Sequence, residues 1–287
     1  MTLRLPQAGP GVTPVRVMTV AGSDSGGGAG IQADMRTFAM LGLHACVAVT
    51  AVTVQNSTGV TGIQEIDPAV VAAQMHSVVP DIGVCAVKTG MLASDPIITA
   101  IAEAATQLGI GGDTGVPLVV DPVCASMHGD PLLASDALGA LTERLMPLAT
   151  VVTPNLDEVR LLTGIDVVDG ASQRAAAAAL RESGARWALV KGGHLRGSEH
   201  SPDILYDGRE FLEFPGRRID TPHDHGAGDT LAAAITGALG HGYRVPDAVA
   251  FAKRWVTRGL AAAYPLGAGH GPVNPLWRLD PAAESPP

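Results

Sequence analysis

The stretch Asp224-His225-Gly226-Ala227-Gly228-Asp229-Thr230-Leu231-Ala232-Ala233 is the most informative part of this chain, because a turn of small residues leads directly into an alanine-rich run. The run predicts a helix that continues to about Gly240. Backbone N–H groups at the start of a helix have no intrahelical partner, and the helix dipole adds partial positive charge there. The turn therefore predicts an anion site, with Asp229 at its mouth.

Asp229 gives this turn a chemical meaning. A carboxylate would repel an anion that is merely stored, but it suits a site where it takes a proton from a hydroxyl while the amides stabilise a transferring phosphoryl group. Asp229 is therefore the candidate general base, and Gly226, Ala227 and Gly228 form the candidate anion hole. The alternative is a capped helix start in which the glycines only make the turn.

Composition narrows the classes of function. With 287 residues, 46% of them hydrophobic, the chain can bury a full core as one large α/β domain or as two small ones. A net charge of −9, few lysines and 3% aromatics argue against a nucleic-acid partner. Cys46, Cys85 and Cys124 lie far apart without metal-ligand spacing, and are typical of small core residues in a reducing compartment. No apolar signal core or membrane-length run occurs, so we expect a soluble cytoplasmic protein without a membrane partner.

Short apolar runs alternate with helical patterns along the chain. Strands that are apolar on both faces and separated by helices predict a mostly parallel sheet covered on both sides. Residues 203–214 predict an antiparallel hairpin at the sheet edge. We expect one domain over residues 15–278, with loose tails at 1–14 and 279–287. The predicted strands are 17–20, 47–54, 84–87, 118–121, 151–153 and 188–190; the predicted helices are 30–41, 68–79, 95–108, 135–146, 155–163, 171–184, 228–240 and 246–262.

Polar clusters follow the predicted strands at the ends where ligands of parallel sheets bind. Residues 21–34 are glycine-rich but match neither a Walker loop nor a dinucleotide fingerprint. They predict either a flexible turn or a loop that closes over a small substrate, with Asp24 and Asp34 as acceptors. Gln55 offers donors and an acceptor that suit the edge of an aminopyrimidine, although an amide there can also cap a turn.

Later strand ends carry groups suited to a nucleotide. Asn155 and Glu158 have the spacing of a capping box, which is an ordinary helix start or a polar pair near phosphates and Mg²⁺. Lys191 precedes two glycines and favours a phosphate contact. Asp121 precedes a proline and is either a metal or water-shell ligand or a turn residue.

Together these segments resemble the ribokinase-type kinases and, more narrowly, the hydroxymethylpyrimidine/phosphomethylpyrimidine kinases of thiamine biosynthesis. The resemblance extends from about Arg16 to Pro275. Gly-Ile-Gln-Ala-Asp within 30–34 and Val-Gln-Asn at 54–56 narrow it to the pyrimidine kinases and the related pyridoxal kinases. The segments that carry it are 21–34, 50–56, 88–92, 129–133, 153–155, 190–194 and 225–230.

The resemblance implies a ribokinase-like three-layer α/β fold, with a mostly parallel central sheet, helices on both faces and a small edge hairpin. It implies transfer from ATP, with Mg²⁺, to 4-amino-5-hydroxymethyl-2-methylpyrimidine and then to its monophosphate. A homodimer is expected for this fold. Members of the family commonly carry Cys where this chain has Asp229, and the Asp form is usual in the related sugar kinases.

Site roles follow from the resemblance position by position. Gln55 is expected to hydrogen-bond the pyrimidine, with Gly22 and Met91 lining its pocket. Asn155 and Lys191 are expected to meet the ATP phosphates. The resemblance places Mg²⁺ between ATP phosphates, through water held by Asp121 and Glu158.

Two rival functions stay open. A pyridoxal, sugar or nucleoside kinase has the same fold, but Gln55 and the apolar surroundings at Val54 and Met91 favour a flat heteroaromatic ring over a sugar. A catalytically silent metabolite sensor would retain the pocket, yet it has no need of Asp229, Lys191 and Asn155 together.

Overall fold

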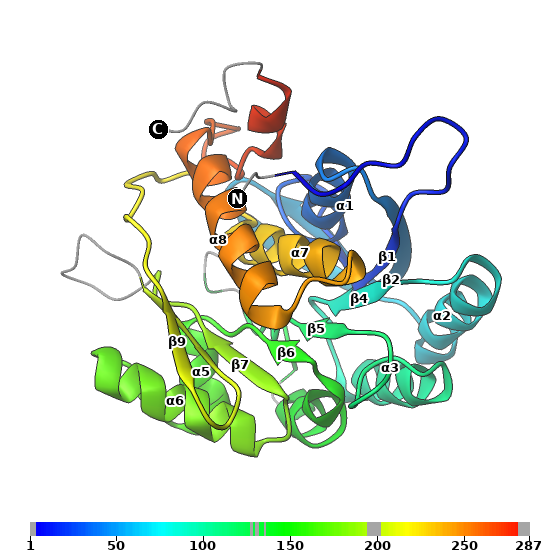
Figure 1. The fold of residues 1–287 in the computed structure, drawn as a ribbon, viewed down its shortest axis with the longest axis horizontal. Coiled ribbons are helices and arrows are strands. Elements are labelled where there is room, and N and C mark those ends of the chain that lie inside the picture. The colour runs from blue at the N-terminus through cyan, green and yellow to red at the C-terminus, as the bar shows by residue number, and fades with distance from the viewer. Residues whose placement is uncertain (1–3, 127–128, 130–131, 135, 194–201, 281–287) are drawn as a thin grey trace.

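A nine-stranded sheet forms the centre of the fold in the computed structural model, which describes residues 4–126, 129, 132–134, 136–193 and 202–280 (Figure 1). Its strand order is β3-β2-β1-β4-β5-β6-β7-β8-β9. The strands are β1 (Arg16–Ser23), β2 (His44–Asn56), β3 (Gly59–Glu65), β4 (Ala86–Thr89), β5 (Leu118–Val120), β6 (Val151–Val152), β7 (Trp187–Val190), β8 (Asp203–Tyr206) and β9 (Phe211–Phe214).

The sheet is mostly parallel, as the sequence predicted. All pairings from β2 through β1, β4, β5 and β6 to β7 are parallel. The hairpin predicted over 203–214 is confirmed as the antiparallel strands β8 and β9 at one edge. β1 lies between β2 and β4, so the chain winds outward in opposite directions from that point. In parallel sheets, such a reversal opens a crevice at the carboxyl ends of the strands.

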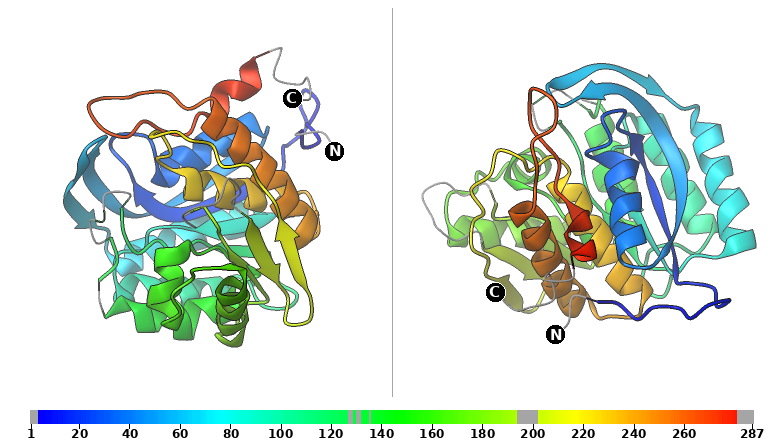
Figure 2. Two further views of the ribbon diagram at one scale, coloured as in Figure 1. Left: turned by 90° about the vertical axis from the view of Figure 1, so that its left-hand side faces the viewer. Right: turned by 90° about the horizontal axis from the view of Figure 1, so that it is seen from above.

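Helices cover both faces of this sheet (Figures 1 and 2). The helices α2 to α6 pack on one face around one hydrophobic core, and α1, α7 and α8 pack on the other face around a second core. The helices are α1 (Gly30–Met40), α2 (Pro68–Ile82), α3 (Asp95–Gln107), α4 (Ala137–Ala140), α5 (Leu156–Thr163), α6 (Gly170–Glu182), α7 (Ala227–Gly240) and α8 (Val245–Ala261).

Successive residues of the central strands pack into different cores. Val17 of β1 and Ala86 of β4 pack with α1, α7 and α8, whereas Met18 and Val87 pack with α2 and α3. Because both faces are buried, these strands are apolar without alternation, which is the pattern that predicted a covered parallel sheet. Lys88 is the single charged residue in β4, and it is fully buried.

The helix predicted over 135–146 forms only in part. Regular helix covers Ala137–Ala140, and the chain continues as a wider turn over Leu141–Leu145 and a tighter one over Met146–Leu148. Pro147 has no N–H to donate, so it cannot continue a regular helix through this segment.

One strand was not predicted. β3 pairs antiparallel with β2 and extends the second edge of the sheet. The turn between them is closed by the side chain of Asn56, whose Oδ1 accepts the N–H of Thr58 at 2.8 Å. This side-chain turn has neither the Asn-Gly nor the Asp-Gly pair that marks a hairpin in a sequence.

Part of the segment predicted as a loose N-terminal tail lies against the molecule. Leu5 is buried in the core beneath α1 and α7, and Nε2 of Gln7 donates to the carbonyl of Leu41 at 2.8 Å. Near the other end, a short 3-10 helix over Pro275–Leu279 packs Trp277 against Trp255 of α8.

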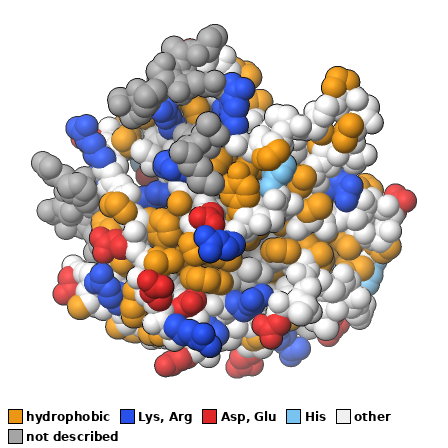
Figure 3. All heavy atoms as spheres, in the orientation of Figure 1, with side chains coloured by type: hydrophobic (Ala, Val, Ile, Leu, Met, Phe, Trp, Pro, Cys, Tyr) orange, Lys and Arg blue, Asp and Glu red, His pale blue; other side chains and the backbone are white. Residues whose placement is uncertain are grey.

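The surface seen in Figure 3 carries charges of both signs side by side along its lower edge, near α6. One such exposed pair joins Arg174 of α6 to Glu213 of β9 at 3.2 Å. Within the described ranges, no helix combines the length and the apolar character that crossing a membrane requires.

Candidate active site

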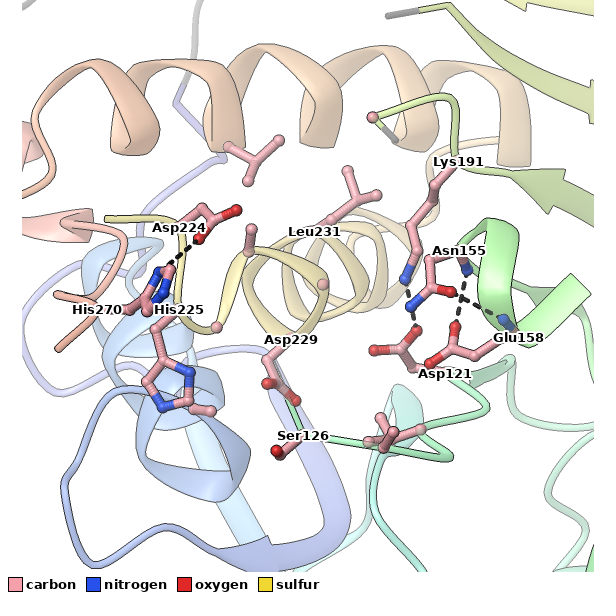
Figure 4. Close-up of a pocket in the computed structure, with 18 of the residues that line it drawn as sticks. Asp121, Ser126, Asn155, Glu158, Lys191, Asp224, His225, Asp229, Leu231 and His270 are labelled. Carbon is pink, nitrogen blue, oxygen red and sulfur yellow. Dashed lines mark hydrogen bonds and ion pairs between the residues drawn. The ribbon is translucent and has the colours of Figure 1, made fainter. Parts of the chain in front are cut away.

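A cavity of about 840 Å³ opens beyond the carboxyl ends of the central strands. All the predicted site residues line it except Asp34. Figure 4 shows Asp229 between two groups of side chains, with His225 on one side and Lys191, Asp121, Asn155 on the other. The structure therefore assembles one site from segments that are far apart in the sequence.

The predicted anion turn is the N-terminus of α7. Gly226 has a left-handed backbone with φ of 77°, and a Cβ there would overlap the carbonyl of Gly28 in the glycine-rich loop. The N–H of Ala227 donates to the carbonyl of Asp224 at 3.0 Å, so this amide of the predicted anion hole already has an acceptor within the turn. The amides of Gly228 and Asp229 lie in the first helical turn, where N–H groups have no intrahelical acceptor.

Asp229 contacts Lys88, a residue to which the sequence analysis assigned no role. Nζ of Lys88 donates to Oδ1 of Asp229 at 3.0 Å and to Oδ1 of Asp34 at 2.6 Å. The hydroxyl of Thr19 donates to the other oxygen of Asp34 at 2.6 Å. The side chain of Asp229 is 14% exposed, whereas those of Asp34 and Lys88 are fully buried. The prediction of Asp34 as a substrate acceptor is therefore wrong, because it pairs with Lys88 beneath the cavity.

The pKa values of the three groups reflect this pairing. Burial alone would lower the pKa of Lys88, but the carboxylates of Asp229 and Asp34 outweigh it and raise that pKa. Burial opposes ionisation of Asp229, yet the Lys88 ammonium brings its pKa below the usual range. Burial raises the pKa of Asp34 to about 7, because it outweighs the attraction of Lys88. Lys88 therefore remains a cation, and Asp229 remains an anion, at neutral pH.

A second buried pair lies on the other side of α7. Nζ of Lys191 donates to Oδ1 of Asp121 at 3.1 Å, and the hydroxyl of Thr153 donates to the same oxygen at 2.8 Å. A Cβ on Gly228 would lie 3.3 Å from Nζ of Lys191. Because residue 228 has no side chain, the Lys191 ammonium can approach the first turn of α7. The ammonium and the partial positive charge of the helix N-terminus then lie close together.

Asn155 and Glu158 form the predicted capping box at the start of α5 (Figure 4). Oδ1 of Asn155 accepts the N–H of Glu158 at 2.9 Å, and Oε2 of Glu158 accepts the N–H of Asn155 at 2.7 Å. Burial raises the pKa of Glu158 to about 7, with Lys191 opposing the rise. The capping role predicted for this motif is confirmed, and both residues also line the cavity.

The oxygen donors at this end fit a magnesium ion. Asp121 and Glu158 supply two carboxylates beside each other, and no group of three or more His, Cys, Asp or Glu residues suited to a metal occurs among the described residues. Mg²⁺ characteristically uses one or two carboxylates and completes its shell with water and phosphate oxygens. Two carboxylates beside Lys191 are therefore suited to an ion that arrives with a phosphate ligand.

Asp24 organises the glycine-rich loop on the opposite side of the cavity. Its Oδ1 accepts the N–H of Gly26 at 2.7 Å, and its Oδ2 accepts those of Gly28 at 2.9 Å and Ala29 at 2.8 Å. Burial opposes ionisation, but the hydrogen bonds from His225 and these amides lower the pKa of Asp24. The carboxylate predicted as a substrate acceptor is thus occupied in holding the loop.

Gln55 lies in the same half of the cavity, with its amide between Thr53 and His225. Its Nε2 is 3.3 Å from Nε2 of His225, and its Oε1 is 3.1 Å from Oγ1 of Thr53. The Thr53 hydroxyl already donates to the carbonyl of Ser23, and Nε2 of His225 faces Asp24 at 3.1 Å. Exchanging the amide oxygen and nitrogen suits both neighbours, because Gln55 then donates to Thr53, and its oxygen shares the Nε2–H of His225 with the carboxylate of Asp24. Its other N–H is then available to a ring nitrogen.

The rest of this half is apolar and narrow. A Cβ on Gly22 would lie 2.9 Å from Sδ of Met91, and the carbonyl of Met91 accepts the hydroxyl of Thr50 at 2.7 Å. Gly22, Gln55 and Met91 line the same cavity, whereas Val54 is 63% exposed and is not among the residues that line it. A flat ring with one polar edge would suit the three residues that do.

The chain matches the family described as phosphomethylpyrimidine kinase over residues 24–274. The hydroxymethylpyrimidine/phosphomethylpyrimidine kinase of Mycobacterium leprae is 63% identical over 278 residues, which cover 96% of this chain and 98% of that protein. The ADP complex of Bacillus subtilis pyridoxal kinase has a TM-score of 0.84 at 34% identity, covering 93% of this chain and 100% of that chain. Phosphomethylpyrimidine kinase of Clostridium difficile has a TM-score of 0.74 at 35% identity, covering 85% of this chain and 98% of that chain. These neighbours confirm the predicted ribokinase-like fold.

Two substitutions in one turn test how tightly the site is packed. Gly226→Ala imposes a left-handed backbone on alanine and brings its Cβ against the Gly28 carbonyl, so we expect the free energy of unfolding to fall by at least about 1–2 kcal/mol. Gly228→Ala places its Cβ 3.3 Å from the flexible end of Lys191 and 3.5 Å, an ordinary contact distance, from Oδ2 of Asp121, so we expect near wild-type stability. Urea unfolding of both variants measures the difference. Equal stabilities would contradict the close contact between Gly226 and Gly28.

Proposed function

Since the chain belongs to the phosphomethylpyrimidine kinase family, we propose that its cavity transfers a phosphoryl group from ATP to the hydroxymethyl oxygen of 4-amino-5-hydroxymethyl-2-methylpyrimidine. The monophosphate formed then accepts a second phosphoryl group. The chain is accordingly a kinase of thiamine biosynthesis, and the residues below are our assignment of roles to its site.

The observation that carries this proposal is the position of Asp229 between two unlike halves of one cavity (Figure 4). Lys191 and Asn155 lie in a half that suits a chain of phosphates. Gln55 and Met91 lie in a half that suits a flat, mostly apolar ring. A hydroxymethyl group on such a ring would reach the carboxylate from one side while a phosphate reaches it from the other.

Asp229 acts as the base in this proposal. The Lys88 ammonium keeps its carboxylate ionised at neutral pH, so it is ready to accept a proton. Phosphoryl transfer passes through a loose transition state, which asks the base to orient the hydroxyl and to take its proton as the new bond forms. The amides of Gly228 and Asp229 and the ammonium of Lys191 would stabilise the charge on the transferring group.

ATP and Mg²⁺ would occupy the half of the cavity near α5. Lys191 and the amide of Asn155 would contact phosphate oxygens, and Asp121 and Glu158 would hold the metal through water. When bound, Mg²⁺ supplies positive charge that neutralises the phosphates. The ADP complex of the Bacillus subtilis pyridoxal kinase supports a nucleotide in this fold.

Pyridoxal is the second candidate acceptor. It also carries a hydroxymethyl group on a nitrogen heterocycle, and a pyridoxal kinase covers 93% of this chain with a TM-score of 0.84. Gln55 would meet either ring. The much higher identity to the Mycobacterium leprae enzyme, 63%, favours the pyrimidine.

Product mass distinguishes these acceptors. Purified protein, ATP and Mg²⁺ are incubated with the hydroxymethylpyrimidine, its monophosphate, pyridoxal and ribose. We expect mono- and diphosphate products from the pyrimidine, and kcat/KM lower by about tenfold or more for pyridoxal. A larger kcat/KM for pyridoxal or ribose would overturn the assignment of the substrate.

Asp229→Asn should separate the two phosphorylations. A primary alcohol needs a base, so we expect its phosphorylation to fall by about 10²-fold or more. The monophosphate is mostly dianionic at pH 7 and is already a nucleophile, so the second step should fall far less or even improve. Lys88 keeps Asp34 as its partner in the variant, so the fold should persist. The measurement is kcat/KM for both acceptors; equal losses would mean that Asp229 is not a base.

We further propose that the enzyme is a cytoplasmic homodimer. Val52 and Val54 of β2, two residues apart on one face, are 44% and 63% exposed. A second copy that covers this strand would remove both side chains from water. Sedimentation velocity should give a dimer for the wild type and a shift toward monomer for Val54→Asp. A wild type that sediments as a monomer at micromolar concentration would contradict the dimer.

A further inference from the structure

Lys88 lies at the centre of the sheet, directly below the site. It is in register with Thr19 of β1, at the point where the order of the strands reverses. Its ammonium reaches Asp34 on α1 and Asp229 on α7, at 2.6 and 3.0 Å. Lys88 is fully buried and does not line the cavity, whereas the carboxylate of Asp229 does. Lys88 therefore acts on the reactants only through Asp229.

Stability alone does not explain both contacts. One carboxylate is enough to match the buried ammonium of Lys88, yet both Asp34 and Asp229 contact it. The two carboxylates disfavour each other's ionisation, and Asp229 is one cause of the raised pKa of Asp34. The contact with Asp229 is instead explained by what the ammonium does to that carboxylate.

We propose that Lys88 is a positioning residue for the phosphoryl transfer described above, and the role rests on that proposed function. The Lys88 ammonium and the backbone N–H of Gly30 both bond the carboxylate of Asp229, so its direction is set before a substrate arrives. The same ammonium keeps Asp229 ionised when a ring and phosphates fill the cavity and exclude water.

The charges near Lys88 and Asp229 decide in which direction each substitution moves the pKa of Asp229. The Lys88 ammonium is within hydrogen-bond distance of this carboxylate, so removing its charge should raise the pKa of Asp229. Removing the charge of Asp34 should do the opposite, because a like charge disfavours ionisation of its neighbour. The other charged or titratable groups that act on this pair are Asp121, Lys191 and His225.

The test is the pH dependence of kcat/KM for the hydroxymethylpyrimidine, from about pH 5 to 9, a range that lies above the lowered pKa of Asp229 in the wild type. Lys88→Met should bring an acidic limb into this range, because the pKa of Asp229 should rise by about 1–3 units. Asp34→Asn should leave the limb below the range. Protonation of the substrate ring is common to all variants and cancels in the comparison. In Lys88→Met, kcat should fall while KM for the pyrimidine changes little.

Two further variants keep the result decisive. Asp34→Asn/Lys88→Met removes the charge of the fully buried Asp34 together with that of Lys88 and leaves only Asp229, which borders the cavity. It should therefore fold even where Lys88→Met does not, and its acidic limb should also move up. Lys253→Met is the matched control, because it breaks another ion pair with little exposure to solvent, with Asp203 at 2.7 Å, that borders the same cavity but does not include Asp229. Whatever its effect on the rate, its acidic limb should stay in place.

The outcomes separate this role from the proposed function. A folded Lys88→Met or double variant that loses activity equally at every pH would show that Lys88 only supports the fold. An upward shift in Asp34→Asn would also overturn the role. A wild type without activity toward the pyrimidine would contradict the proposed function first, and this role with it.

Discussion

The burial of one ammonium in the middle of the sheet constrains the rest of the site. An ion of this kind costs several kcal/mol to remove from water unless carboxylates surround it. Lys88 finds them on two helices, Asp34 on α1 and Asp229 on α7, which must therefore pack over the same strands. The N-terminus of α7 then lies where the strand order reverses, and Asp229 reaches the cavity. One electrostatic requirement thus connects the core of the fold with its reactive end.

Close backbone contact provides the second constraint. The glycine-rich loop after β1 and the turn before α7 touch at Gly28 and Gly226, where side chains would collide. The carboxylate of Asp24 accepts hydrogen bonds from amides of that loop and contacts His225 in the turn. The two segments therefore form one continuous wall of the cavity. A side chain at either glycine would force these two segments apart.

The charge beside position 229 also decides which side chains could be anionic there. A thiol at this position would lie beside the same ammonium of Lys88. A neighbouring cation lowers the pKa of a thiol as it does that of a carboxylate, and so favours the anion in both cases. A carboxylate adds fixed negative charge near the transferring phosphoryl group, and Lys88 together with Lys191 compensates for it.

Local patterns determined much of this protein. Unbroken apolar runs identified strands that are buried on both faces, and parallel strands bring their ends together, so Gln55, Lys191 and Asp229 could be assigned to one site. The tertiary structure alone decided which polar groups face the cavity. Asp34 is buried against Lys88, 54 residues away, and the partner of Lys88 at Asp229 is 141 residues away. Sequence patterns report which face of an element is apolar, but the pairing of buried charges depends on which helices pack over the same strand.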